Sequence, residues 1–166
     1  TTYTNPAGHP PATEHEDLGT KTNRENPDGH NRWGARRMTQ ERYADALTDF
    51  TRAVQCDSTY LLSYFNRALV YSHMNRPVES LRDFDRTIEL DSTNSLAYFN
   101  RAIVRSQIGD YNRALDDYNQ VAFYTPDNVL VYYNRALLQS YHGTLNAALH
   151  DFDKAIQLYP DCANAY

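Results

Sequence analysis

The sequence predicts an all-α fold, an α-α superhelix (solenoid) of antiparallel helix pairs with an irregular N-terminal segment. Three observations predict it. A five-residue string recurs at a fixed step of 34 residues, apolar residues between the copies follow helical spacing, and prolines and glycines separate the helical stretches. A period of this length is typical of a unit that buries its apolar face only by stacking on its neighbours.

The recurring string ends in Asn-Arg-Ala and spans residues 64–68, 98–102 and 132–136, with Tyr166 one further step along. Leucines, aspartates and aromatic residues keep the same step in three more series: Leu47, Leu81, Leu115 and Leu149; Asp49, Asp83, Asp117 and Asp151; Phe50, Phe84, Tyr118 and Phe152. Because these series are in phase at one period, each 34-residue unit is expected to place equivalent residues in equivalent surroundings.

Each unit is predicted to hold two helices. In the second helix, apolar residues such as Leu81, Phe84 and Ile88 recur at spacings of three and four, which indicates one buried helical face. Gly109 separates the two helices of its unit, and Pro126 ends the second helix because proline cannot continue one.

The 34-residue helix–turn–helix unit, with an aromatic residue at its fourth position and alanine at its eighth, resembles the tetratricopeptide repeat family. Position 20 of the family pattern is alanine, and here one unit has Ser80, a departure that leaves the fold prediction intact. The resemblance divides the chain into a Pro/Gly-rich extended segment, a degenerate first unit, three complete units and the start of a further one: 1–29, 30–60, 61–94, 95–128, 129–162 and 163–166.

The extended segment, residues 1–29, has almost no aliphatic side chain beyond Leu18. Such a segment does not bury enough apolar surface to offset its own conformational entropy. We expect it to lie in the groove of its own or a neighbouring chain, or to be a linker. The chain starts without Met and ends in mid-pattern, so we expect it to be part of a longer protein.

Composition argues against several classes of function. A net charge of −5 with scattered arginines lacks the basic footprint of a nucleic-acid-binding protein. No apolar run of 18 residues indicates a transmembrane segment in this piece. Phosphate-binding loops, nucleophile motifs and metal-ligand spacings are missing from the sequence, which therefore predicts no enzyme, no cofactor and no metal site.

Arginine occupies position 7 of each complete unit, where many family members carry a leucine that faces the partner helix. A charge in that place needs a partner, and aspartates recur with the same step. We expect a structural ion-pair ladder between the helices, with bidentate geometry, formed by Arg67, Arg101, Arg135, Asp49, Asp83, Asp117 and Asp151. The alternative is that the arginines bind an acidic ligand.

Asparagine occupies position 6, as Asn66, Asn100 and Asn134. The resemblance places it on the concave face, similar to the asparagine ladder of the O-linked N-acetylglucosamine transferase superhelix, whose amides meet the backbone of an extended peptide. An amide can pair with a peptide N–H and C=O together. Positions 5 and 9 add apolar surface to this predicted peptide-binding groove: Phe65, Phe99, Tyr133, Leu69, Ile103 and Leu137. Leucines at position 2 and serines at position 12 flank it: Leu62, Leu96, Leu130, Ser72, Ser106 and Ser140.

The predicted function is a non-catalytic scaffold for protein–protein interaction that binds an extended peptide or partner segment along this groove. Chaperone-tail clamps of some family members need Lys and Arg there, so this uncharged groove favours apolar partners. Two alternatives stay open: an architectural segment of a longer envelope or secretion-assembly solenoid, and the substrate-docking part of a larger enzyme. The units are similar to those of bacterial family members, including envelope ones, and the compartment is left open.

Overall fold

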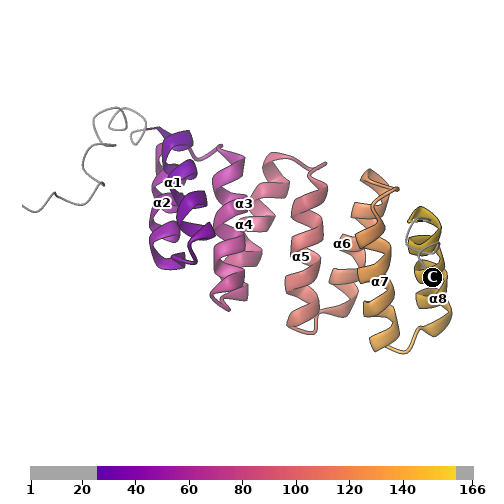
Figure 1. The fold of residues 1–166 in the computed structure, drawn as a ribbon. Coiled ribbons are helices and arrows are strands. Elements are labelled where there is room, and N and C mark those ends of the chain that lie inside the picture. Colours follow the sequence, from indigo (N-terminus) through magenta and orange to yellow (C-terminus); the bar gives the residue numbers. More distant parts are fainter. Residues whose placement is uncertain (1–25, 160–166) are drawn as a thin grey trace, which may run out of the picture.

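The computed structural model describes residues 26–159, and this part of the chain forms eight α-helices and no strand. The helices are α1 (Pro27–Thr39), α2 (Tyr43–Cys56), α3 (Leu61–His73), α4 (Pro77–Leu90), α5 (Ser95–Gln107), α6 (Tyr111–Tyr124), α7 (Val129–Tyr141) and α8 (Leu145–Leu158). They pack as the pairs α1/α2, α3/α4, α5/α6 and α7/α8, which stack in one row (Figure 1). The all-α solenoid prediction is confirmed.

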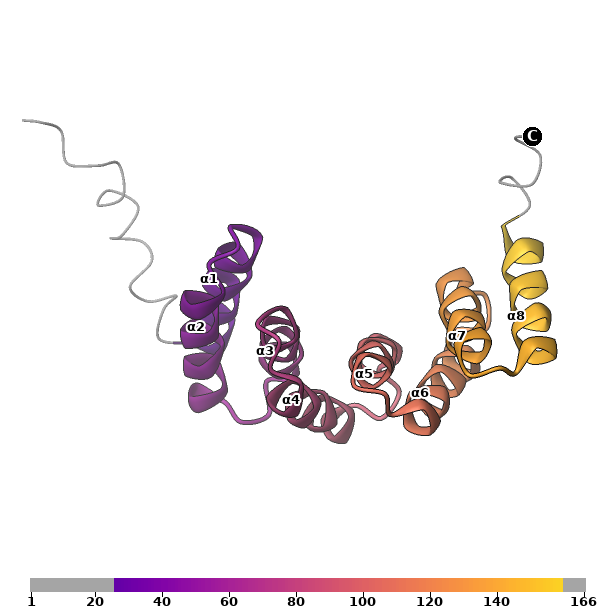
Figure 2. The same ribbon diagram turned by 90° about the horizontal axis from the view of Figure 1, so that it is seen from below.

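The row of helix pairs is curved (Figure 2). The first helices of the pairs, α1, α3, α5 and α7, lie on the inner side of the curve, and the second helices lie on the outer side. Each first helix has 13 residues and each second helix has 14. This regularity places equivalent residues of successive units side by side along the inner surface.

A residue with positive φ follows each first helix, at position 15 of the unit. Gly109 and Gly143 have φ of 81°, whereas Glu41 and Asn75 adopt φ of 59° and 56° in the same place. Glycine adopts this conformation without steric cost, and glutamate does so least readily of the three residue types. The packing of the helix pair therefore imposes the turn even where the local residue opposes it.

We expect Glu41→Gly to raise the free energy of unfolding by about 0.5–1 kcal/mol, because it removes the steric strain of a side chain at positive φ. Gly109→Ala makes the reverse change at an equivalent turn, where the new methyl group meets open space. It should lower the free energy of unfolding by about 1 kcal/mol. Urea unfolding of both variants measures the two changes. Shifts of the same sign would contradict this account.

Helix α1 begins at Pro27, so the predicted boundary between the extended segment and the first unit is three residues too late. Asn26 Oδ1 accepts a hydrogen bond from the Gly29 N–H at 2.6 Å, and Pro27 stands in the first turn, where its missing N–H costs nothing. Pro27 contributes to the Pro/Gly-rich composition that predicted an extended segment, but proline is also favoured in the first turn of a helix. The rest of the extended segment, and its predicted place in the groove, lie outside the described residues, as do residues 163–166.

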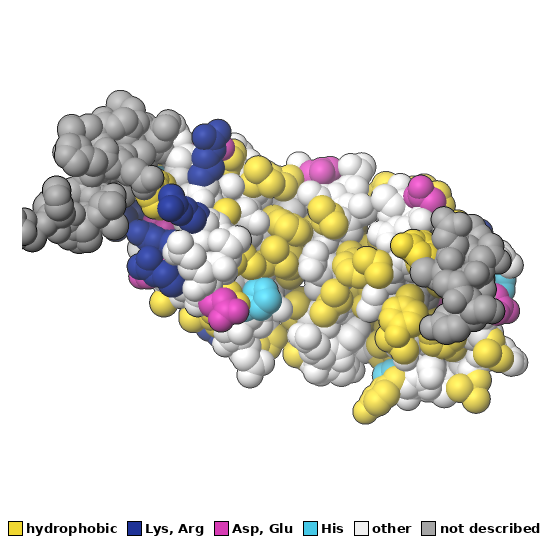
Figure 3. All heavy atoms as spheres, in the orientation of Figure 1, with side chains coloured by type: hydrophobic (Ala, Val, Ile, Leu, Met, Phe, Trp, Pro, Cys, Tyr) yellow, Lys and Arg dark blue, Asp and Glu magenta, His cyan; other side chains and the backbone are white. Residues whose placement is uncertain are grey.

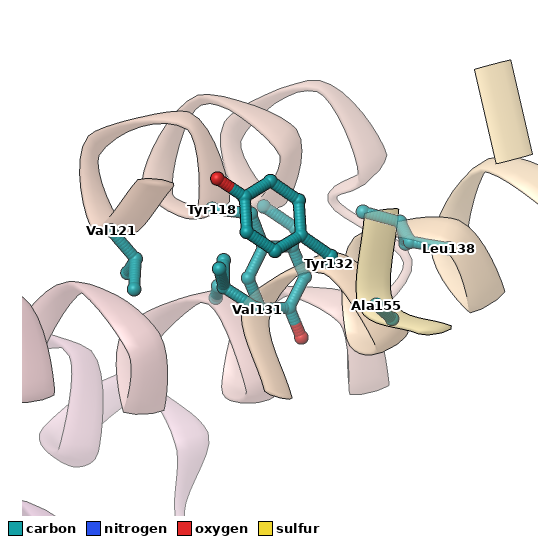
Figure 4. Packing of buried hydrophobic residues seen from close by; sticks show 8 residues of the cluster. Tyr118, Val121, Val131, Tyr132, Leu138 and Ala155 are labelled. Atoms are coloured by element: carbon teal, nitrogen blue, oxygen red, sulfur yellow. The ribbon is translucent and has the colours of Figure 1, made fainter. Parts of the chain in front are cut away.

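The apolar core follows the row as three adjoining clusters. The aromatic residues at position 24, Phe50, Phe84 and Tyr118, are at most 3% exposed. The largest cluster joins α5, α6, α7 and α8. Its members labelled in Figure 4 are Tyr118, Val121, Val131, Tyr132, Leu138 and Ala155. Each unit thus covers the apolar face of the one before it.

Departures from the family pattern are accommodated by hydrogen bonds. Ser80, in the alanine place at position 20, is buried, and its hydroxyl donates to the Ala68 carbonyl at 2.8 Å. Thr87 at position 27 donates to the Asp83 carbonyl at 2.9 Å. Because both hydroxyls are satisfied, they leave no uncompensated polar group in the core.

Candidate functional site

The arginines at position 7 bind an aspartate within their own unit. In each case Nε and Nη2 donate to both carboxylate oxygens, at 2.7–3.0 Å, in the pairs Arg67–Asp83, Arg101–Asp117 and Arg135–Asp151. All three aspartates are buried. Each guanidinium also lies against the ring of the tyrosine at position 4, with 5.4–5.7 Å between Cζ and the ring centroid. The structure therefore brings these six residues together as bidentate pairs.

The remaining nitrogen of each guanidinium, Nη1, reaches position 25 of the preceding unit. The three contacts are Arg67 to Thr51 at 3.4 Å, Arg101 to Asp85 at 2.8 Å and Arg135 to Asn119 at 3.0 Å. Each arginine thus joins both helices of its own unit to the second helix of the unit before it. This link between units was not part of the predicted ladder.

The remaining aspartate of the series, Asp49, pairs with an arginine at a different position of the repeat. Position 7 of the first unit is Trp33, and Arg37 Nη1, one turn further on, donates to Asp49 at 2.8 Å. Burial raises the pKa of Asp49, and the Arg37 charge opposes this only in part. Arg105 has the equivalent place in its own unit and gives Asp117 a second cation at 2.7 Å.

The arginine geometry favours a structural role over ligand binding. Arg67, Arg101 and Arg135 direct all three side-chain nitrogens at protein oxygens, so little of their hydrogen-bonding capacity is left for an acidic ligand. The hydrogen bond with Asp83 raises the pKa of Arg67 above its usual value, so the guanidinium stays charged.

The asparagines of α5 and α7 bond to their own helices. Asn100 Nδ2 donates to the Leu96 carbonyl, and Asn134 Nδ2 donates to the Leu130 carbonyl, each at 2.8 Å. This contact fixes the amide on the helix surface. It uses one of the two Nδ2 hydrogens and leaves Oδ1 to accept from a ligand.

Asn66 differs from the other two asparagines. Its Nδ2 donates at 3.0 Å to Oδ1 of Asn31, a buried residue of α1. The Ser63 hydroxyl also approaches that oxygen, at 3.4 Å. Asn66 therefore helps to join the first two units, and the three asparagines do not form one uniform row.

The aromatic residues at position 5 are shared between the inner surface and the core. Phe65, Phe99 and Tyr133 each contact the position 24 aromatic of the same unit edge to face, with ring centroids 5.9–6.0 Å apart. Phe65 and Phe99 are half-buried, while Tyr133 is exposed. Tyr133 therefore has more surface available for a ligand than the two phenylalanines.

The leucines at position 2 are 50–62% exposed, and they are Leu62, Leu96 and Leu130. At position 9, Leu137 is exposed, whereas Leu69 and Ile103 are half-buried. Figure 3 looks onto the inner side of the row: hydrophobic side chains are spread over α3, α5 and α7 among few charges, and basic side chains gather near α1.

A pocket with a volume of about 360 Å³ opens between α5 and α7. Its lining residues are Ile103, Ser106, Gln107, Gly109, Tyr118, Asn134, Leu137, Leu138, Tyr141 and His142. The structure thus brings together three of the predicted groove residues, Ile103, Asn134 and Leu137. It adds Tyr141, which is 91% exposed, and Tyr118 from α6.

Tyr118 is a residue that sequence reasoning placed only in the core. Burial raises the pKa of its hydroxyl, which therefore stays protonated at neutral pH. The other units have phenylalanine at this position. The change from phenylalanine to tyrosine in one unit was the available sequence signal that this part of the groove differs from the rest.

Within residues 26–159, no group of His, Cys, Asp and Glu side chains is placed to hold a metal ion. In the same range, every helix is too short or too polar to span a membrane.

Two family models, both described as tetratricopeptide repeat, match the chain, one over residues 84–116 and one over residues 129–162. Its fold is similar to that of the crystal structure of MamA, with a TM-score of 0.81 and 19% identity over 90% of this chain and 86% of that one. The chain is a tetratricopeptide repeat protein.

Other tetratricopeptide repeat structures are similar to it. The Arabidopsis OM64 TPR domain has a TM-score of 0.68 and 19% identity, over 72% of this chain and 98% of that one. The first TPR of Spaghetti (RPAP3), bound to the HSP90 peptide SRMEEVD, has a TM-score of 0.66 and 20% identity, over 68% and 89%. At these identities the likeness concerns the fold alone. No curated protein sequence matches this tetratricopeptide repeat protein.

Proposed function

We propose that this protein is a non-catalytic scaffold that binds an extended apolar peptide, or a partner segment, across α3, α5 and α7. One side chain of the peptide enters the pocket between α5 and α7. The pocket is the observation that carries the proposal. It places the exposed Leu137 and Tyr141 beside the polar groups of Asn134 and Ser106, the combination of apolar walls and few polar groups that ligand sites share.

The asparagines supply contacts to the peptide backbone. Packed helices lie about 10 Å apart, and an extended chain rises about 3.3 Å per residue, so Asn100 and Asn134 meet backbone groups about three residues apart. Each such hydrogen bond contributes about 1 kcal/mol net. Two of them give little affinity, so the apolar contacts have to supply most of it.

The charge of the surface supports an apolar partner. Positions 2, 5, 6, 9, 12 and 13 of α3, α5 and α7 hold no lysine or arginine. The RPAP3 domain was solved with the acidic peptide SRMEEVD, and this surface has no cations to pair with such a sequence. On α1, Asp28 and Arg32 form an exposed ion pair at 3.0 Å, so we place the peptide on the three later first helices.

Selection from a random peptide library, followed by fluorescence-polarisation titration of the selected sequences, tests the proposal. Asn134→Ala should weaken binding about fivefold, which corresponds to one hydrogen bond. Leu137→Ser should weaken it about tenfold, because it removes apolar surface from the pocket wall. Asn112→Ala, an exposed asparagine on the outer helix α6, is the matched control and should leave binding unchanged.

Circular dichroism confirms that each variant is folded before titration. If no peptide is selected, or if Asn134→Ala and Asn112→Ala bind alike, the groove proposal is wrong. The acidic peptide SRMEEVD serves as a negative probe. Tight binding of that peptide would contradict the expected apolar preference.

A further inference from the structure

The pocket between α5 and α7 contains a buried hydroxyl group, that of Tyr118, which is 3% exposed. The ring of Tyr118 packs edge to face against Phe99, with ring centroids 6.0 Å apart. A phenylalanine ring makes this kind of contact equally well, and the other units have phenylalanine at the same position: Phe50, Phe84 and Phe152. Packing therefore accounts for the ring of Tyr118 and leaves its hydroxyl to be explained.

The proton of the Tyr118 hydroxyl is not used in the fold. Within residues 26–159, Tyr118 donates no hydrogen bond to a protein acceptor, whereas the buried Tyr132 donates to the Pro126 carbonyl at 2.7 Å. Burial raises the pKa of Tyr118, and the Ser106 hydroxyl beside it lowers that pKa by less. A buried tyrosine hydroxyl usually has a hydrogen-bond partner, so this unused donor indicates a ligand group in the pocket.

The hydroxyls of Tyr118 and Ser106 give the pocket a free donor and a free acceptor. Tyr118 supplies the donor, and Ser106 Oγ can accept because its own proton goes to the Ala102 carbonyl at 2.7 Å. A ligand hydroxyl accepts and donates through one oxygen, so it can pair with both groups together. An amide would instead bring a further N–H against apolar walls such as Ile103 and Leu137.

The pocket also disfavours a charged ligand group. Among the described residues, no lysine or arginine lines it. A carboxylate that entered the pocket would lose its hydration without gaining a strong counter-charge. An uncharged aromatic ring suits the apolar walls better, because such a ring buries about 150–250 Å² of surface. The pocket therefore combines the requirements of an aromatic ring and of a hydroxyl.

We propose that the side chain that enters this pocket is a tyrosine of the bound peptide, and that Tyr118 selects it over phenylalanine. The phenol oxygen of the ligand accepts the hydrogen bond that Tyr118 donates, and the phenol proton goes to Ser106 Oγ. Tyr141, which is exposed at the pocket, packs against the ligand ring. The inference rests on the proposed function, because it names the residue by which the pocket recognises the peptide.

The affinities of two capped amino acids test the inference. N-acetyl-tyrosine amide and N-acetyl-phenylalanine amide are uncharged and differ by one hydroxyl group. Each is titrated into the isotope-labelled chain, and the backbone amide resonances of Asn134 and Leu137 report binding by NMR. The tyrosine amide should bind about tenfold more tightly, because the phenylalanine ring displaces water from Tyr118 and leaves its hydroxyl unpaired.

Tyr118→Phe identifies the source of this preference. It introduces the residue that the other units have, and circular dichroism should show a chain as stable as the original. The preference for the tyrosine amide should fall to about twofold or less, while the phenylalanine amide binds no more weakly than before. Tyr124→Phe removes a hydroxyl from α6 outside the pocket. This matched control should keep the tenfold preference.

Equal binding of the two amides, or a preference for tyrosine that persists in Tyr118→Phe, overturns the inference. Unchanged pocket resonances with both amides overturn it as well. None of these results depends on the peptide library or on Asn134→Ala, so the groove proposal can stand where this inference fails. If the library yields no peptide but the tyrosine amide binds with a preference that depends on Tyr118, the groove proposal fails and the selectivity of the pocket is supported.

Discussion

Arg67→Leu should lower the free energy of unfolding by about 3 kcal/mol, because it leaves the carboxylate of Asp83 buried without a counter-charge. Asp83 is 3% exposed and receives both of its ionic hydrogen bonds from this arginine. The same change in the next unit should lower the free energy of unfolding by less. Arg101→Leu should lower the free energy by about 1.5 kcal/mol, since Arg105 still neutralises Asp117.

Urea unfolding followed by circular dichroism measures both losses. Arg113→Leu is the control, because Arg113 is exposed and its Nε lies 3.8 Å from Oδ2 of Asp110. This change should alter the free energy of unfolding by no more than about 0.5 kcal/mol. Combining Arg67→Leu with Asp83→Leu should recover much of the loss, because no charge is then left buried. Equal losses for Arg67→Leu and Arg101→Leu would show that the second arginine does not compensate.

Gly34→Ala should destabilise the protein by about 2 kcal/mol. A methyl group on Gly34 would lie 2.6–2.8 Å from three ring atoms of Phe50, which is fully buried. Alanine has the better helix propensity by about 1 kcal/mol, but a contact this short requires the ring or the helix to move. The equivalent residues of the other units are alanine: Ala68, Ala102 and Ala136. A substitution toward the repeat consensus is therefore expected to be harmful here.

Thermal unfolding checks this expectation, and a second variant identifies the cause. Phe50→Leu shortens the opposing side chain, so Gly34→Ala should cost less in that background than in the original protein. If Gly34→Ala raises the unfolding temperature instead, the helices α1 and α2 can separate more easily than the contact distances indicate.

The fold could be predicted because the 34-residue period determines most of it. Residues one step of 34 apart, such as Phe50 and Phe84, occupy equivalent places in successive helix pairs, so one pattern determines helices, turns and core together. The pairing of Arg67 with Asp83 follows the same logic, since both residues belong to one unit. The start of α1 was missed because Pro27 has two interpretations, as a breaker or as a first-turn residue, and only the cap from Asn26 distinguishes them.

The groove was less predictable, because its side chains depend on neighbours from other units. Asn66 bonds to Asn31, and Asn31 belongs to the degenerate unit, which has no repeat pattern at that place. Phe65 and Phe99 are divided between core and surface by packing within the unit. The pocket beside Tyr141 arises where α5 and α7 meet, and a repeat pattern describes each helix without describing the space between them.

The contacts of the position 7 arginines all run in one direction along the row. Each Nη1 reaches back to the preceding unit, so every described unit except α7/α8 is held by an arginine from the unit after it. In a row where each unit contacts only its neighbours, local stability depends on those contacts. Within residues 26–159, each end unit therefore takes part in one such link and each inner unit in two, so opening from either end breaks fewer of these links than opening in the middle of the row.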